Sequence, residues 1–359
     1  MTSRNGAPHR TPPPLAIGRL IIGDGRPCVI IAEAACEHKG RLAEAKRMAR
    51  AAKASGADIV KFQLHLPEAE MLPGSIRFWA GSMDDVLKQV NLSIDDHRAL
   101  MRYCRKIGIQ YLCTAYCAAG IDVLEELGVP AFKIGSGEMT NLPMMRHVAR
   151  LSTRTRKPVI VSTGMSTMEE IAETVAVMKR ERAYFMLLNC TSEYPPNPAH
   201  INLGLLSVLR KRFGVHVGHS DHSPTNYTAL ASVALGARVI EKHFTPARKQ
   251  RGPDWHVSIE PHELASLVEG VRTIEAALGA TKRLYPQERP VRRWAHHSVV
   301  SLTEIPAGSV IRPEMVGVKR PGYGVPAKHL ETFYGRIVTN NVPADTLLRW
   351  GDVMRGGDR

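Results

Sequence analysis

The feature that most constrains the fold of this chain is an alternation of short β-rich runs with longer helical stretches. Apolar residues recur at helical spacing in stretches such as 41–55 and 94–108. Strands that alternate with helices in this way predict a parallel sheet. The β-rich runs number eight and cover residues 28–33, 58–63, 109–114, 130–134, 157–162, 183–190, 215–220 and 237–243.

Eight such units over about 250 residues predict an α/β protein built on a closed (β/α)8 barrel, the TIM barrel. An open doubly wound sheet is the alternative, but the first turn, AEAACEHKG, lacks the GxGxxG pattern of dinucleotide folds. We expect the barrel at residues 16–280, after a flexible tail at residues 1–15. Residues 64–91 are too long for an ordinary connection, and we expect a lid, a decoration or an oligomer contact there.

The character of the sequence changes after a helical stretch at 261–278. Residues 281–294 are basic and contain prolines, which predicts a linker. The remainder, 295–359, contains an internal repeat in which IPAGSVIRPEMV (305–316) aligns with VPADTLLRWGDV (342–353). This repeat predicts a small β-rich domain with pseudo-twofold symmetry.

Composition argues against several classes of function. The net charge is +14, but the basic residues are spread along the chain and aromatic residues make up only 6%. A nucleic-acid-binding surface is therefore not expected. The remaining explanations of the positive charge are a soluble basic surface and an anionic substrate. No apolar run approaches the roughly 18 residues of a membrane span, and the first residues contain no apolar signal segment.

The cysteines indicate a reducing compartment. Six occur without the dense spacing of a disulfide framework, so we expect free thiols and a cytoplasmic location. Cys113 and Cys117 are separated by three residues, which is a weak indication of zinc because no second pair matches them.

Polar residues lie at the C-terminal end of each predicted strand, where barrels of this class place their chemistry. In IVKFQ, Val60 and Phe62 share one face, and Lys61 lies on the other. The same alternation separates Lys133 from its apolar neighbours, so both lysines are expected to point into the barrel. The polar residues at the strand ends are Glu33, Lys61, Gln63, Thr114, Lys133, Ser162, Thr163, Asn189, His219, Asp221, His222 and His243.

Two inward lysines together with Ser136, Ser162 and Thr163 predict a pocket for a small anion, with phosphate as the natural candidate. The GSG that follows Lys133 allows backbone N–H groups to approach an anion closely. The structural alternative is that each lysine is paired with a glutamate at the top of the barrel.

His222 and His243 end neighbouring strands. Two imidazoles in such positions are able to share a divalent metal while leaving coordination positions open, which is a catalytic arrangement. Alternatively, each is a hydrogen-bonded core residue. The ligand type alone does not fix the metal.

The chain resembles the sialic acid synthase family from about residue 17 to 356. The motifs that carry the resemblance are IIAEAACEHKG, GADIVKFQ, FKIGSGEMTNLP, VIVSTGMS, NCTSEYP, GHSDH, ALGARVIEKHFT, GPDWHVS and VKRPGYG. The resemblance implies a (β/α)8 barrel followed by a small antifreeze-like (SAF) domain. It also implies a domain-swapped homodimer in which the small domain covers the partner's active site.

The activity that the resemblance implies is condensation of phosphoenolpyruvate with an N-acylated amino-sugar aldehyde and water, with C–O cleavage and release of phosphate. It implies a divalent metal at His222 and His243, usually Mn²⁺, with Mg²⁺ or Co²⁺ as alternatives. The residues implied to hold phosphoenolpyruvate are Lys61, Thr114, Lys133, Ser136 and Ser162.

The family pattern also implies residues on the sugar side. Glu33, Glu138 and Tyr194 are implied to contact the sugar or to position water and protons, and Arg320 to reach the sugar's acyl group from the partner subunit. The buried charges are then expected to be paired only when substrate arrives. Further candidates for substrate binding are Gln63, Ser192 and Asp221.

Two positions depart from the family pattern. Glu37 stands where many members have asparagine, and Ser192 stands where several sialate-making members have asparagine. Because both are expected on the sugar side, the sugar stays open between N-acetylmannosamine, its 6-phosphate and a di-N-acetylated dideoxy sugar of legionaminic or pseudaminic acid synthesis.

Three other functions compete with this one. Another phosphoenolpyruvate-condensing barrel would lack the C-terminal repeat. A non-catalytic carbohydrate-binding relative would have lost the lysines or histidines. A nucleic-acid-binding protein would show salt-sensitive retention on DNA.

Overall fold

The computed structural model of the chain describes residues 11–78 and 81–354. The chain forms two compact units, one ending at Gly279 and the other beginning at Ala280. Residues 1–10 of the expected tail, and Trp79 in the 64–91 segment, lie outside the described residues. No helix in the described part of the chain has both the length and the apolar character needed to cross a bilayer.

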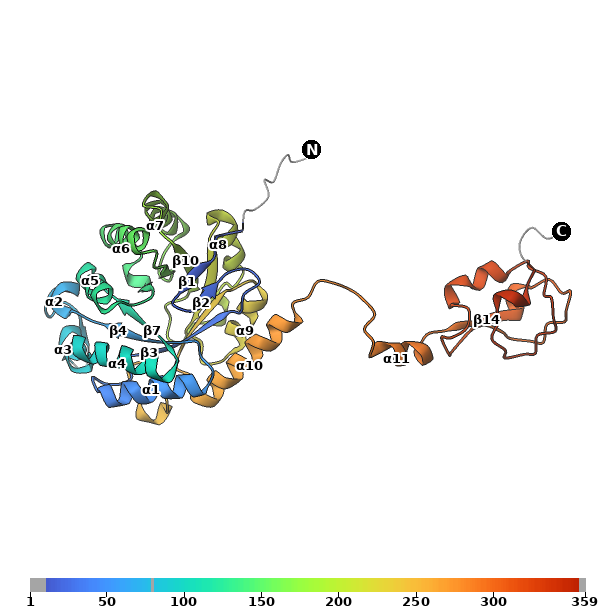
Figure 1. Cartoon of the computed structure of the whole chain (residues 1–359), viewed down its shortest axis with the longest axis horizontal. Helices are drawn as coiled ribbons and strands as arrows, with labels where there is room; N and C mark the ends of the chain where they lie inside the picture. The colour runs from blue at the N-terminus through green and yellow to red at the C-terminus, as the bar shows by residue number, and fades with distance from the viewer. Residues whose placement is uncertain (1–10, 79–80, 355–359) are drawn as a thin grey trace. The chain divides into compact units, whose positions relative to one another are not determined.

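The first unit is a closed barrel of eight parallel strands surrounded by helices (Figure 1). Each strand overlaps one of the predicted β-rich runs, so the predicted strands and their closure into a barrel are confirmed. In order around the barrel, the strands are β3 (Val29–Ala35), β4 (Ile59–Leu64), β7 (Gln110–Ala115), β8 (Phe132–Ile134), β9 (Val159–Ser162), β10 (Phe185–Cys190), β11 (His216–Asp221) and β12 (Val239–His243).

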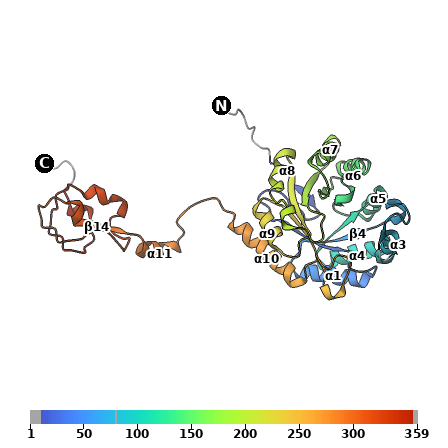
Figure 2. The same cartoon turned by 180° about the vertical axis from the view of Figure 1, so that it is seen from behind.

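Helices cover the outside of the barrel, as the view from behind also shows (Figure 2). Local sequence sets their ends. Thr167 and Glu170 form a reciprocal capping box at the start of α7, and α4 and α5 end at Gly108 and Gly128 in the left-handed region. The covering helices are α1 (Leu42–Ala54), α4 (Ile94–Ile107), α5 (Ala118–Leu127), α6 (Leu142–Thr155), α7 (Met168–Arg180), α8 (Leu205–Phe213), α9 (Tyr227–Ala234) and α10 (Pro261–Ala277).

The 64–91 segment has structure of its own. It contains α2 (Pro67–Glu70), β5 (Arg77–Phe78), β6 (Gly81–Ser82) and α3 (Met83–Val90). Its two ends are joined, because Nδ2 of Asn91 donates a hydrogen bond to the carbonyl of His65 at 2.7 Å. The segment is therefore a folded excursion whose base lies at the end of β4.

The barrel interior has an apolar layer below a polar one. The apolar layer is continuous with a hairpin of β1 (Leu15–Ile17) and β2 (Leu20–Ile22), which packs against its N-terminal end. Leu15, at the end of the expected tail, is buried and paired with Ile22. The inward residues of this layer are Ile31, Ile59, Leu112, Ala131, Ile160, Met186, Leu188 and Val239.

The second unit has a separate core around Val299, Ile311 and Phe333. The repeat is visible in it, since Ile305 and Val342, which are equivalent in the two copies, exchange backbone hydrogen bonds of 2.8 and 2.9 Å. The segment expected as a linker contains a helix. The elements of this unit are α11 (Glu288–Ala295), β13 (Ser298–Ser301), β14 (Val316–Lys319) and the 3-10 helices η4 (Pro313–Met315), η5 (Ala327–Phe333) and η6 (Trp350–Asp352).

Candidate active site

A cavity of about 290 Å³ lies at the C-terminal ends of the barrel strands. Its lining includes almost all of the site residues predicted in the barrel, although they are spread over more than two hundred positions of sequence. These are Glu33, Lys61, Gln63, Thr114, Lys133, Ser136, Glu138, Ser162, Ser192, Tyr194, His222 and His243.

Lys61 already has partners within the protein. Its Nζ lies 2.6 Å from Oε2 of Glu33 and donates a hydrogen bond to Oγ1 of Thr114 at 2.8 Å. Burial alone would lower the pKa of Lys61, but Glu241 and Glu33 raise it above its ordinary value. The expectation that the buried charges are paired only when substrate arrives is therefore wrong.

Glu241 lies between the two lysines. Its Oε1 is 3.7 Å from Nζ of Lys61 and 3.6 Å from Nζ of Lys133, and it accepts a hydrogen bond from Ser220 at 3.2 Å. Although burial raises the pKa of Glu241, the attraction of Lys133 and Lys61 brings it below its ordinary value. Glu241 therefore carries the negative charge that makes burial of two ammonium groups tolerable.

Lys133 has a looser environment than Lys61. Its Nζ donates to Oγ of Ser162 at 2.8 Å and to the carbonyl of Ile134 at 3.0 Å. Burial lowers the pKa of Lys133. Its nearest carboxylate oxygen in a salt bridge is the one at 3.6 Å on Glu241, so it has room to approach an anion.

Hydroxyl groups gather beside Lys133. Oγ of Ser136, at the start of the 3-10 helix η1 (Ser136–Glu138), accepts a hydrogen bond from the backbone N–H of Gly164 at 3.0 Å. A Cβ on Gly164 would lie only 2.3 Å from Oγ of Ser192 and 2.7 Å from Oγ of Ser136. Glycine at this position thus lets the serines and the backbone approach closely enough to surround a small anion.

Two carboxyl groups in the cavity are suited to proton exchange near neutral pH. Burial, opposed by Lys61, raises the pKa of Glu33 to about 7. Burial also raises the pKa of Glu138 to about 7, and among the described residues its Oε2 finds no hydrogen-bond partner. A general acid or base works best when its pKa lies near the operating pH.

His222 and His243 face one another at the mouth of the barrel, with ring centroids 5.2 Å apart. Nδ1 of His222 lies 2.8 Å from the carbonyl of Thr191, and because a carbonyl only accepts, this nitrogen is the donor. Its Nε2 therefore carries a lone pair, 3.1 Å from the hydroxyl of Tyr194, whose ring stacks on His222 at 4.1 Å.

The histidine pair fits a divalent metal. Burial lowers the pKa of His222 to about 4 and that of His243 to about 3, so both rings are neutral at physiological pH. Nδ1 of His243 is buried and has no hydrogen-bond partner among the described residues. Neutral imidazoles with available lone pairs are common metal ligands.

A second group of potential ligands lies at the start of α10, formed by Glu260, His262 and Glu263. Both carboxylates already have structural partners. The backbone N–H of Arg248 donates to Glu260 at 2.8 Å, and its guanidinium pairs with Glu263. We therefore assign this group to capping of the helix.

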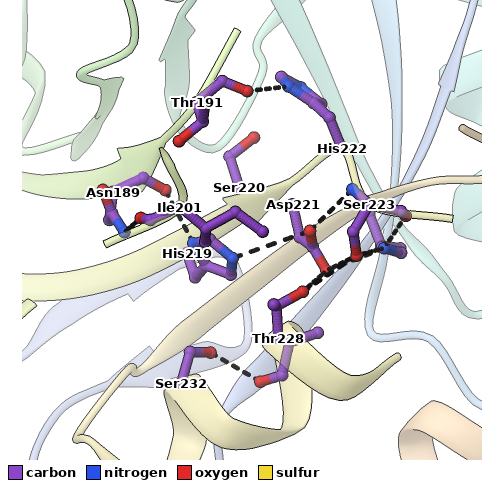
Figure 3. A network of polar contacts seen from close by, with 12 residues as sticks. Asn189, Thr191, Ile201, His219, Ser220, Asp221, His222, Ser223, Thr228 and Ser232 are labelled. Atoms are coloured by element: carbon purple, nitrogen blue, oxygen red, sulfur yellow. Dashed lines mark hydrogen bonds and ion pairs between the residues drawn. The ribbon is translucent and has the colours of Figure 1, made fainter. Parts of the chain in front are cut away.

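Asp221, which was predicted as a substrate-binding residue, is not among the residues that line the cavity. Its Oδ2 accepts hydrogen bonds from Oγ1 of Thr228 at 2.8 Å and from Oγ of Ser223 at 3.1 Å (Figure 3). It also accepts one from Nζ of Lys242 at 2.8 Å. The strand alternates its side chains, so Ser220 and His222 reach the cavity whereas Asp221 points towards α9.

Three other predicted polar strand ends belong to the barrel wall. Nδ2 of Asn189 donates to the carbonyl of Ile201 at 3.0 Å, and His219 contacts the carbonyl of Asn189 at 3.1 Å (Figure 3). Oγ1 of Thr163 donates to the carbonyl of Leu188 at 2.9 Å. The side chains of Asn189, His219 and Thr163 thus form hydrogen bonds with backbone carbonyl groups of the barrel. The serines that line the cavity are left as hydroxyl groups able to contact an anion.

Glu37 also lies away from the cavity lining, although it was expected on the sugar side. Its Oε1 accepts a hydrogen bond from the backbone N–H of Asp254 at 2.7 Å, and a Cβ on Gly252 would collide with the carboxylate at 1.9 Å. Asp254 in turn has a carboxylate oxygen 3.7 Å from Nδ1 of His243. Glu37 therefore holds a loop that borders the histidines.

Arg320 lies in the second unit. Its Nε donates to the carbonyl of Ala295 at 3.1 Å, and its guanidinium lies over the ring of Trp294 at 5.4 Å. The reach of Arg320 to a partner's cavity stays a prediction.

Sequence reasoning missed several residues that line the cavity. Glu241 had the clearest signal, because alternation in RVIEKHF places it on the same face as His243. Alternation in β11 likewise separates Ser220 from Asp221. Tyr116 lies beyond the end of β7, where strand periodicity gives no direction, and Cys190 had been considered only as a thiol. Besides the glycines of the GSG turn, the missed residues are Tyr116, Met165, Cys190, Ser220 and Glu241.

The chain is similar to known synthases over nearly its whole length. The N,N'-diacetyllegionaminic acid synthase of Campylobacter jejuni is 36% identical, with 89% of this chain and 98% of that protein covered. The N-acetylneuraminate-9-phosphate synthase of Homo sapiens is 34% identical, with 90% and 92% covered. The crystal structure of the N-acetylneuraminic acid (sialic acid) synthetase of Leptospira borgpetersenii, in complex with citrate, has a TM-score of 0.72 and 30% identity, with 79% of this chain and 96% of that chain covered.

Family models divide the chain in the same way. The model of the SAF domain matches residues 296–354, in the second unit. The model of the NeuB family matches residues 48–283, which include most of the barrel and both histidines. The confirmed barrel, the site at its strand ends and these matches agree, and the chain belongs to the NeuB family.

Proposed function

We propose that this protein condenses phosphoenolpyruvate with an N-acylated amino-sugar aldehyde and water, giving a nonulosonic acid and phosphate. The observation that carries the proposal is the convergence of two buried lysines, several serine hydroxyls and two neutral histidines in one cavity. Support also comes from relatives named as synthases of legionaminic acid and of N-acetylneuraminate 9-phosphate.

The lysines and hydroxyls suit the phosphate and carboxylate of phosphoenolpyruvate. When this anion arrives, it competes with Glu33 and Glu241 for the ammonium groups. Lys133, whose nearest carboxylate oxygen in a salt bridge is 3.6 Å away, is the freer of the two cations to contact the anion. Lys61 contacts the anion while it stays beside Glu33, which remains ionised and able to accept a proton.

His222 and His243 are the proposed metal ligands. The divalent ion, Mn²⁺ in our proposal with Mg²⁺ or Co²⁺ as alternatives, supplies a Lewis acid for the aldehyde oxygen when bound. Tyr194 stacks on His222 and lies edge-on to His243 at 5.8 Å, so its ring fixes both imidazoles and shields them from water. The hydrogen bond to Thr191 sets the tautomer of His222.

The reaction balances in bonds and protons. C3 of phosphoenolpyruvate attacks the aldehyde carbon, water adds at C2, and the bond from C2 to the bridging oxygen breaks. The aldehyde oxygen gains one proton and the water loses one, while the hydroxyl proton of the adduct leaves with phosphate. Glu138 is the proposed donor to the aldehyde oxygen and Glu33 the proposed acceptor from water, because both have a pKa of about 7.

We further propose a cytoplasmic, domain-swapped homodimer, in which Arg320 of one subunit contacts the acyl group of the sugar bound to the other. The proposal of this arrangement rests on the family resemblance. Six free, buried thiols fit the reducing cytoplasm.

The sugar has two candidate classes, because relatives acting in legionaminic and in N-acetylneuraminate synthesis are almost equally similar to this chain. A panel of N-acetylmannosamine, its 6-phosphate and di-N-acetylated dideoxy sugars, scored by phosphate released from phosphoenolpyruvate, tests the function. Turnover of at least one sugar is expected. A non-catalytic carbohydrate-binding role has little support, since the lysines and histidines are all present.

A further inference from the structure

A line of side-chain contacts leads from the cavity into the 64–91 segment. Nε2 of Gln63 donates a hydrogen bond to Oε1 of Glu33 at 3.1 Å. Behind it, Oε1 of Gln63 lies 3.3 Å from Nε2 of His65. Nδ1 of His65 lies 2.9 Å from Oε2 of Glu70, in α2. Three successive contacts thus join a proposed catalytic carboxylate to the first helix of the segment.

The chemistry of these groups fixes their orientation. A carboxylate accepts hydrogen bonds, so Gln63 presents its NH₂ group to Glu33 and its carbonyl oxygen to His65. That carbonyl needs a donor, and Nε2–H of His65 supplies it, while Nδ1–H of His65 donates to the carboxylate of Glu70. The thiol of Cys36 is a second, weaker donor to the same carbonyl, at 3.5 Å. If the amide turned over, its oxygen would face the oxygen of Glu33, and the two acceptors would repel each other. The ring of His65 is therefore the stronger of the two donors that direct the NH₂ group of Gln63 towards Glu33.

The ring of His65 is itself held from several sides. It stacks on Tyr116 at 4.3 Å with an interplanar angle of 11°, and Tyr116 lines the cavity. Asn91 binds the backbone carbonyl of His65 at 2.7 Å. His65 is 6% exposed, so water does not compete effectively for its ring nitrogens.

Each carboxylate oxygen of Glu33 is therefore bound by a different residue of β4, and these two residues lie on the same face of the strand. Lys61 holds Oε2 at 2.6 Å and Gln63 holds Oε1 at 3.1 Å. Without the second contact, the carboxylate would be free to rotate about the ion pair with Lys61. Small misplacements of a group that handles a proton slow an enzyme strongly, by about a hundredfold for roughly 1 Å.

We propose that His65 is a positioning residue for Glu33, acting through Gln63, and that the 64–91 segment supports the chemistry through Glu70 and Asn91. This inference rests on the proposed function, because it concerns the role of Glu33 in that reaction. In this proposal the 64–91 segment helps to orient a catalytic carboxylate, which neither a lid nor an insertion without a function would do.

The first test compares three variants in steady-state kinetics. His65→Phe keeps the stacking on Tyr116 but removes the Nε2–H donor, which leaves Oε1 of Gln63 with the weaker thiol donor of Cys36 at 3.5 Å, and kcat is expected to fall about tenfold to a hundredfold. The KM for phosphoenolpyruvate should stay within about threefold, because Lys61, Lys133 and the serines are untouched. Glu68→Gln, at an exposed site of α2, is the matched control and should behave as wild type.

The variant Glu70→Gln distinguishes two roles for His65. In one, His65 only holds Gln63 in its orientation; in the other, His65 exchanges a proton with Glu70 during the reaction. A glutamine NH₂ at this site donates to Nδ1 of His65, which leaves the proton on Nε2 and the contact with Gln63 intact. Its kcat should remain within about threefold of wild type. If kcat of His65→Phe equals that of the wild type, the proposal is overturned. It is also overturned if kcat of Glu70→Gln falls as far as that of His65→Phe. Should His65→Phe fail to fold, Gln63→Met removes the same link and should give the same loss.

A second readout does not need turnover. In ¹⁵N-labelled protein, the side-chain NH₂ signals of Gln63, assigned from their absence in Gln63→Glu, should move in His65→Phe and stay in place in Glu68→Gln. Unmoved signals in His65→Phe overturn the proposal even if the enzyme is active. If the wild type releases no phosphate with any sugar, the proposed function fails, whereas these signals still decide the role of His65.

Discussion

Nζ of Lys61 and Oε2 of Glu33, on neighbouring strands of the barrel, lie 2.6 Å apart, and both side chains are buried. Together with Glu241 and Lys133, they form a compact group of two cations and two carboxylates. Such a group offsets the cost of burying the two lysines, because each ammonium group has a carboxylate oxygen within 4 Å. It also holds the cations in place for an incoming anion.

Replacement of Lys133 should abolish phosphate release while the fold survives. Burial lowers the pKa of Lys133, so Lys133→Ala removes a charge that was costly to bury. Loss of one cation aimed at the substrate should lower kcat/KM by about 10³-fold, measured as phosphate from phosphoenolpyruvate, with a thermal melting temperature close to wild type. Lys88→Ala, at a half-exposed site, serves as control. Normal turnover in Lys133→Ala would remove Lys133 from the mechanism.

Removal of the metal should be reversible. Treatment with a chelator is expected to eliminate phosphate release, and added Mn²⁺ should restore it, since two neutral histidines converge in the cavity. His243→Ala should lower the metal content per chain, measured by elemental analysis, and His262→Ala should leave it unchanged. Activity that is indifferent both to chelation and to His243→Ala would contradict the metal site.

Glu37 should make folding stability depend on pH. Burial raises the pKa of Glu37 from the usual 4.5 to about 7. The folded state thus holds this proton more tightly, so the stability it contributes is fully present below pH 4.5 and is lost as the pH rises through 7. Glu37→Gln should gain up to about 3 kcal/mol of unfolding free energy, relative to wild type, between pH 4.5 and pH 8. Urea unfolding at both pH values measures this, and a difference that does not change with pH would refute it.

Complementation tests the proposed exchange of domains. Lys133→Ala and Arg320→Ala should each be poorly active alone. If Arg320 acts on the partner's cavity, a mixed dimer of the two variants contains one intact site, so random mixing of subunits should restore about a quarter of wild-type activity. If Arg320 acts within its own subunit, mixing restores nothing. Sedimentation of the wild type should show a dimer.

Strand periodicity predicted most of the fold and much of the site. Alternation in IVKFQ correctly placed Lys61 inside the barrel, next to the apolar layer that begins at Ile59. The same rule, applied to β11, separates His222 from Asp221, and Asp221 was assigned to the site only because it lies near the end of the strand. Where a residue lies within a regular strand, the period of two determines its side.

Contacts between distant residues could not be predicted in this way. The sequence contains Glu33, Lys61 and Glu241, but their pairing depends on barrel closure, which brings β12 next to β3. Glu37 and Asp254 meet because two loops after neighbouring strands fold against each other. Periodicity also does not reveal that the 64–91 segment folds back so that Glu70 reaches His65, because loops follow no repeat.

The most direct test of the account follows the bridging oxygen of phosphoenolpyruvate. Phosphoenolpyruvate labelled with ¹⁸O between C2 and phosphorus is incubated with the enzyme, Mn²⁺ and the best sugar of the panel, and the released phosphate is examined by mass spectrometry. Cleavage of the C–O bond, which the account predicts, delivers the label to phosphate together with one equivalent of the nine-carbon acid. Unlabelled phosphate, or no phosphate with any sugar and metal, would contradict it.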